Sequence, residues 1–146
     1  MNSLADILLA SHHKDALVTD TAALLERHVQ SRGGLKGFAL KAGLSLLKAK
    51  RPDILQRATN RLLPEMLAAL EPLYRQFRKS SDGDFAVFLS KNAEAASGAL
   101  LAVADARIAN SGQAARSAYQ KFRAGADDEV HLLLPALGKL FSAYIG

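Results

Sequence analysis

The chain has 146 residues, of which 49% are apolar and 23% charged, a balance typical of one folded domain rather than of a disordered segment. Alanine (27) and leucine (25) far outnumber the 12 valine, isoleucine and threonine residues, so the composition favours an all-α fold. The absence of cysteine excludes disulfides, thiolate metal sites and thiol catalysis, and the net charge of +5 favours an anionic partner.

The N-terminal part of the chain predicts two helices. Ser3 and Asp6 have the spacing of a capping box, which opens a short first helix. A second helix runs from residue 15 or 20 to residue 30, and the glycine pair at 33–34 ends it.

The next helix, residues 35–50, is unusual because apolar side chains nearly encircle its axis. Only Lys41, Ser45 and Lys48 form a narrow polar line. A helix that is apolar on most sides is typical of the centre of a bundle. We therefore predict a largely buried central helix near residues 35–50.

Pro52 separates this helix from the following one, which runs from residue 53 to about 79 and can bend at Pro64 and Pro72. After a polar loop, Asp84 is a good N-cap for a single long helix from residue 85 to about 110. A short helix (113–123) and a final helix that starts at Gly125 complete the chain. The prediction is one compact domain, residues 1–146, built as an all-α bundle of six or seven helices.

No segment predicts export or a membrane span. Residues 1–13 lack the basic start and long apolar run of a signal peptide. The most apolar window, residues 95–104, is about half as long as the ~20 residues that a span requires. We expect a cytoplasmic protein without a transmembrane segment.

No arrangement of residues predicts catalysis or metal binding. The four histidines include no pair at i, i+4, and the Glu-x-x-His pairs of a di-iron bundle are missing. Asp105 lies in a largely apolar helix, where an ion pair with Lys41 or Lys48 outranks a role as catalytic acid. His131 can contact Asp127 or Asp128 one turn away. We predict no catalytic residue, metal ligand or cofactor, and favour a protein that is not an enzyme.

Positive charge is concentrated between residues 27 and 61. Nine Lys and Arg residues accompany a single acid, Asp53, for a sum of +8, whereas residues 1–26 sum to −3 and residues 62–146 to zero. Clustered charge of one sign creates a local field that attracts anions. The candidate anion-binding or partner-binding residues are Arg32, Lys36, Lys41, Lys48, Lys50, Arg51, Arg57 and Arg61.

Two runs carry a resemblance to a known family. They are LKGFALKAGLSLLKAKRPDILQRATNRLLPEMLAALEPLY, from Leu35 to Tyr74, and ALLAVADARIANSGQAARSAYQKFRAGA, from Ala99 to Ala126. Together they resemble a family of small uncharacterised bacterial all-helical proteins, a domain of unknown function. The resemblance implies a helical domain and a bacterial source, and it supplies no functional residues.

Three hypotheses for the function remain open. The leading one is a non-enzymatic interaction protein whose basic face (27–61) meets an acidic protein partner or a second copy of the chain. The alternative is an intracellular carrier of an apolar or fatty-acyl ligand held between helices. Its candidate lining residues are Gly37, Gly43, Gly98 and Ala102, with Lys41 or Lys48 pairing with a carboxylate.

The third hypothesis is binding of an anionic membrane surface or of nucleic acid through the same basic region. The wide apolar arc of residues 35–50 favours a buried helix over an interfacial one. The basic residues also lack the interleaved aromatic side chains of a nucleic-acid site. Both forms of this hypothesis therefore rank below the other two.

Overall fold

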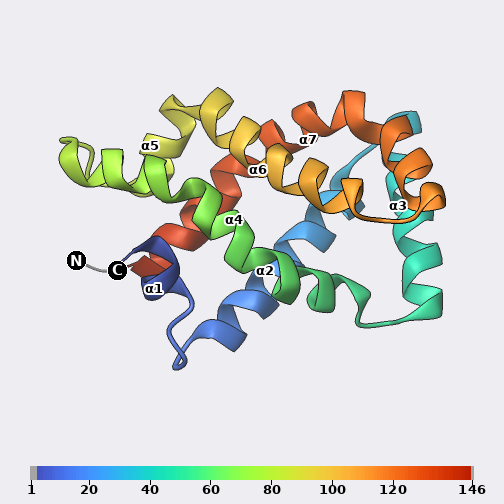
Figure 1. The fold of residues 1–146 in the computed structure, drawn as a ribbon, viewed down its shortest axis with the longest axis horizontal. Helices are drawn as coiled ribbons and strands as arrows, with labels where there is room; N and C mark the ends of the chain where they lie inside the picture. The colour runs from blue at the N-terminus through green and yellow to red at the C-terminus, as the bar shows by residue number, and fades with distance from the viewer. Residues whose placement is uncertain (1–2, 146) are drawn as a thin grey trace.

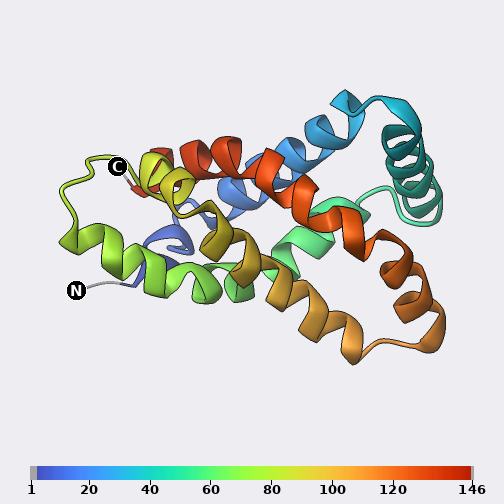
Figure 2. The same ribbon diagram turned by 90° about the horizontal axis from the view of Figure 1, so that it is seen from above.

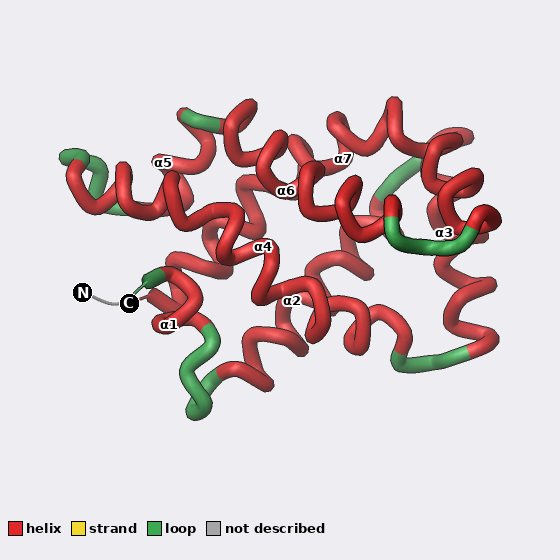
Figure 3. The backbone as a smooth tube through the Cα atoms, viewed as in Figure 1, coloured by secondary structure: helices red, strands yellow, loops and turns green. Residues whose placement is uncertain are grey.

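The computed structural model describes residues 3–145, except for the side chains of Ala114, Ala115, Ala118, Lys121, Phe122 and Ala124. Within that range the chain forms seven helices and no strand (Figure 3). They are α1 (Leu4–Leu8), α2 (Lys14–Ser31), α3 (Gly34–Lys50), α4 (Ile54–Lys79), α5 (Phe85–Lys91), α6 (Ala93–Ala109) and α7 (Gln113–Ile145). The predicted all-α bundle of six or seven helices is confirmed.

The helices form an elongated molecule with two unlike ends (Figures 1 and 2). At one end, α1 and α5 lie with the C-terminal parts of α4 and α7, next to both chain ends. At the other end, α3 projects from the bundle and packs on α2 and α4. We call the first region the core end. The open end consists of α3, the last turns of α6 and the first half of α7.

One apolar cluster holds the core end together. Its side chains come from every helix except α3, and Leu67 and Phe141 at its centre are fully buried. Burying a large apolar side chain stabilises a fold by roughly 1.5–3 kcal/mol, so this cluster is the main source of stability. Its members are Leu4, Leu8, Leu17, Val18, Leu63, Leu67, Leu70, Leu73, Tyr74, Phe85, Phe88, Leu89, Ala96, Leu100, Leu134, Leu137 and Phe141.

Side-chain caps fix the helix starts at the core end. Ser3 and Asp6 form the predicted capping box of α1, with both reciprocal hydrogen bonds present. At the start of α5, the backbone N–H of Ala86 donates to Asp84 Oδ1 at 2.8 Å, as predicted. Ser142 of α7 donates to the same Asp84 oxygen at 2.9 Å, so this cap also ties α5 to the last helix.

The prediction of a largely buried central helix near residues 35–50 is wrong. In α3 only Gly37 and Leu44 are buried, whereas Leu35 and Phe38 are 90% and 73% exposed. Apolar side chains do surround the helix axis, but neighbouring helices cover only one side. The sequence pattern reports which side chains are apolar, and burial also requires a neighbour to cover them.

Two predicted helix boundaries also differ from the structure. The single helix expected from residue 85 to about 110 is divided at Asn92, which has φ −116° and ψ 37° and whose side chain donates to Phe88 O at 2.9 Å. Such side-chain hydrogen bonds compete with the helical pattern. Conversely, the chain stays helical through Gly125, and the last two predicted helices form the continuous α7. Packing of α7 on α5 and α6 outweighs the cost of about 1 kcal/mol for a glycine inside a helix.

The α2–α3 junction requires glycine at two positions. Gly34 has φ +71°, a left-handed conformation that other residues rarely adopt. Gly37 lies against the backbone of Arg32, and a Cβ at this position would stand 2.2 Å from the Arg32 carbonyl oxygen. This close approach lets the chain turn sharply out of α2 into α3.

Candidate functional site

The outer face of α3 carries a continuous row of apolar side chains. Leu35, Phe38 and Leu46 are 90%, 73% and 71% exposed, and Ala42 and Ala49 beside them are exposed as well. Their spacing of three and four residues places all five on one side of the helix. We call this set the α3 stripe. Contiguous exposed apolar side chains are typical of surfaces that bind a partner or a membrane.

Lysines border the α3 stripe on both sides. Helical geometry places Lys36 and Lys50 along one edge and Lys41 and Lys48 along the other. The helix contains no acidic residue. Lys48 forms an ion pair with Glu26 of α2, whereas Lys36 and Lys50 are exposed. The apolar row therefore has exposed positive charge along the edge of Lys36 and Lys50, whereas Lys48 on the other edge is paired with Glu26.

The structure gathers only part of the predicted basic set on this helix. Arg51 immediately follows α3 as its C-cap and is exposed. Arg57 and Arg61 belong to α4, and Arg57 lies 3.8 Å from Asp53, the N-cap residue of this helix, in an ion pair. Arg32, at the end of α2, is half-buried and paired with Glu129. Of the predicted set, the four lysines thus lie on α3 and Arg51 at its C-terminal end, whereas the other three arginines belong to other segments.

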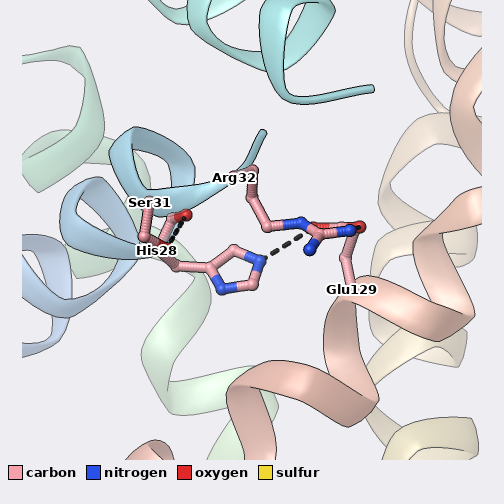
Figure 4. A network of polar contacts seen from close by, with 4 residues as sticks. All are labelled: His28, Ser31, Arg32 and Glu129. Carbon is pink, nitrogen blue, oxygen red and sulfur yellow. Dashed lines mark hydrogen bonds and ion pairs between the residues drawn. The ribbon is translucent and has the colours of Figure 1, made fainter. Parts of the chain in front are cut away.

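A partly buried ion-pair cluster joins the end of α2 to α7 (Figure 4). Arg32 donates two hydrogen bonds of 2.9 Å, one to each carboxylate oxygen of Glu129. His28 Nε2 lies 2.8 Å from Glu129 Oε1, and the Glu129 side chain is only 17% exposed. Burial raises the pKa of Glu129, but the hydrogen bonds from Arg32 and His28 outweigh it and hold that pKa below its ordinary value.

A cavity of about 570 Å³ lies between α3 and the facing parts of α6 and α7. We call it the α3 cavity. Most of its walls are apolar, and Lys36, Tyr119 and Glu129 are the polar lining residues. The apolar lining residues are Leu35, Ala39, Leu40, Leu101, Ala104, Gly125, Ala126 and Val130.

Asp105 is held by α7 rather than by α3. It accepts hydrogen bonds from Tyr119 at 2.6 Å and from Arg123 Nε at 2.9 Å. The hydrogen bonds from Arg123 and Tyr119 lower the pKa of Asp105. Burial, together with the hydrogen bond to Asp105, raises the pKa of Tyr119 to about 12. The expected structural ion pair exists, but the prediction of Lys41 or Lys48 as its partner is wrong.

The four predicted ligand-lining residues lie outside the α3 cavity. Gly37 is covered by the Arg32 backbone. Gly43, Gly98 and Ala102 are exposed, and a Cβ at either glycine would meet no atom within 4 Å. A small residue leaves usable space only where another helix faces it, and these positions face solvent.

The described residues contain no group of three His, Asp or Glu side chains that could hold a metal ion. His131 Nδ1 lies 3.7 Å from Asp127 Oδ1 within α7, which is the structural contact considered from the sequence. Within residues 3–145, no helix is both long and apolar enough to cross a membrane.

The sequence model of a family of unknown function, DUF6918, matches residues 4–145. The chain belongs to this family. The match confirms the resemblance to an uncharacterised helical family, whereas the bacterial source remains a prediction. Because DUF6918 has no assigned function, membership identifies no reaction and no site residue. Comparisons with curated proteins and with solved structures gave no match.

Proposed function

We propose that this DUF6918 protein is a non-enzymatic binding protein that docks on an anionic membrane surface through α3. The observation that carries the proposal is the α3 stripe, an exposed apolar row bordered by lysines on a helix without acids. The predicted cytoplasmic location fits this role, because the cytoplasmic leaflet is rich in anionic lipids.

The dimensions of α3 suit a helix that lies flat in the membrane interface. Its 17 residues span about 25 Å at ~1.5 Å per residue. In this orientation Leu35, Phe38 and Leu46 enter the boundary between head groups and acyl chains, while the lysines stay level with the phosphates. Each lysine near such a surface contributes about 1 kcal/mol, and the apolar side chains add the burial energy of their exposed area.

The charge pattern of α3 disfavours a second copy of the chain, nucleic acid or an acidic protein as the partner of the α3 stripe. A second copy that packed its α3 against this one would bring two lysine-bordered helices together, with no acid on either helix to offset the repulsion. Nucleic acid would satisfy the lysines but leave the α3 stripe in water. An acidic protein would need an apolar groove for the α3 stripe and acidic residues on both rims for the lysines. An anionic bilayer offers an apolar interior and a negatively charged surface along the whole length of the helix.

Vesicle co-sedimentation tests the proposal. We expect binding to phosphatidylglycerol vesicles, weak binding to phosphatidylcholine vesicles, and release of the protein by salt. Leu46→Ser should weaken binding about tenfold, because it removes a side chain that inserts on docking. Val87→Ser is the matched control, since Val87 is also exposed (47%) but belongs to α5 at the core end.

Two outcomes would overturn docking on an anionic membrane surface. One is equal binding to charged and neutral vesicles, which would remove the role of the lysines. The other is the absence of binding to either kind of vesicle. In that case, a protein complex that is lost on Leu46→Ser would assign α3 to an acidic protein partner.

A further inference from the structure

We infer that the α3 cavity binds one long-chain amphiphile with an anionic head group, and that Lys36 is the counter-ion of that head group. The inference rests on the proposed function for the source of the ligand. Leu35 belongs both to the α3 stripe and to the cavity wall, so docking of α3 would bring the cavity next to the bilayer.

The volume and the walls of the cavity suit an acyl chain. About 570 Å³ lies within the range of roughly 300–1,000 Å³ found for small-molecule sites. The space exists because small residues, Ala39 on α3, Ala104 on α6 and Gly125 and Ala126 on α7, occupy facing positions. Larger residues there would fill the gap and extend the apolar core toward α3.

The polar lining residues select the head group. Tyr119 donates its hydroxyl hydrogen to Asp105, and both oxygens of Glu129 are engaged by Arg32 and His28. Among the described residues, Lys36 forms no ion pair or hydrogen bond. Lys36 is therefore the lining residue whose positive charge no other described residue pairs with, and an anionic head group would pair with it.

The position of Lys36 places this charge at the mouth of the cavity. The side chain is exposed and reaches across to α7, where Nζ would lie 3.5 Å from a Cβ on Gly125. A chain inserted between α3 and α6 would leave its head group at this ammonium. A carboxylate or phosphate gains an ion pair there, whereas a neutral alcohol does not.

Calorimetric titration of the full chain with three ligands, each kept below the concentration at which it aggregates, tests the inference. The ligands are palmitate, the lysophosphatidylglycerol with the same acyl chain, and hexadecanol. One site per chain for either anion supports the inference, and the tighter of the two distinguishes a free fatty acid from a bilayer lipid. Absence of binding by both anions, or equally tight binding of hexadecanol, would overturn it.

Two pairs of variants locate the site. Ala104→Leu fills the cavity and should weaken palmitate binding at least tenfold, while Ala102→Leu, exposed on the same helix, should leave it unchanged. Lys36→Glu should weaken palmitate binding about tenfold, because the attraction between the exposed ammonium and the carboxylate becomes a repulsion. Lys50→Glu, on the same edge of the stripe but away from the cavity, should have no effect on palmitate.

The lysine pair also separates the two proposals. Both substitutions change the charge of α3 equally and should weaken vesicle binding alike, but only Lys36→Glu should affect palmitate. Palmitate binding without vesicle binding would retain the cavity and reject membrane docking. Vesicle binding without binding of either palmitate or lysophosphatidylglycerol would retain membrane docking and reject the cavity. Because Lys36 is exposed, its substitution keeps the test decisive even if Ala104→Leu impairs folding.

Discussion

The core end and the open end are both built from helices rich in leucine and alanine, but their apolar side chains differ in how far they are buried. At the core end, seventeen side chains from six helices form one cluster, with Phe141 fully buried. At the open end, α3 carries Phe38 at 73% exposure, and a cavity separates this helix from α6 and α7. The difference lies in the neighbours rather than in the residue types. Stability is concentrated at one end, and the surface available for binding at the other.

Replacing one phenylalanine at each end should produce the largest difference in stability between the two ends. Phe141→Ala should lower the free energy of unfolding by about 3–5 kcal/mol, because it leaves a void in the core cluster. Phe38→Ala should change it by no more than about 0.5 kcal/mol, since the side chain is already in water. Urea unfolding monitored by circular dichroism measures both. A similar loss in the two variants would mean that α3 contributes to the core after all.

A smaller effect is expected at the junction that carries α3. Gly37→Ala should lower the stability of α3 by about 1–3 kcal/mol, because the new Cβ would collide with the Arg32 carbonyl oxygen. Hydrogen exchange of the α3 amides measures this local opening. Gly43→Ala is the matched control on the same helix, where a Cβ meets nothing and should stabilise the helix by roughly 0.5–1 kcal/mol. Faster exchange in both variants would show that the close approach to Arg32 is not the cause.

The ion-pair cluster between the ends should give the smallest loss and a defined pH dependence. Glu129→Gln should cost about 1–2 kcal/mol at neutral pH, because the hydrogen bonds from Arg32 lose their charged acceptor.

The sign of this pH dependence follows from the lowered pKa of Glu129. The folded protein favours the ionised carboxylate, so its contribution is complete above the ordinary pKa of 4.5 and is lost as the pH falls through the lower folded value. The stability difference between wild type and Glu129→Gln should therefore shrink only at acid pH. The same substitution at Glu94, an exposed acid on α6, provides the control. A difference that grows on acidification would contradict the assignment.

Local features were predictable from the sequence, and features that depend on distant segments were not. The capping box at Ser3 and the N-cap at Asp84 involve residues close in the chain, and both are confirmed. In the last helix, Leu134 and Phe141 stand seven residues apart in the sequence, on one side of the helix, and both are buried, whereas Pro135 is exposed. Such patterns indicate which side of a helix packs against a neighbouring helix.

The candidate site lay beyond sequence reasoning because its parts are far apart in the chain. Arg32 and Glu129 are separated by 97 residues, and no periodicity links them. In the same way, Gly43 and Gly98 were candidates for leaving space between helices, but space arises only where another helix faces the gap, as at Ala104. The two apolar sides of α3 are similar in sequence, and the structure alone distinguishes the packed side from the α3 stripe.

The first and last helices meet in the core, and this affects how the protein folds during synthesis. Leu4 and Leu8 of α1 share a cluster with Leu134 and Phe141 of α7, and the two helices are in contact. A nascent chain therefore cannot complete its core until α7 has left the ribosome. The α3 stripe emerges long before that point. For much of translation, the α3 stripe is thus exposed on a chain whose core is incomplete. Chaperones or a nearby bilayer would be the first binding partners available to it.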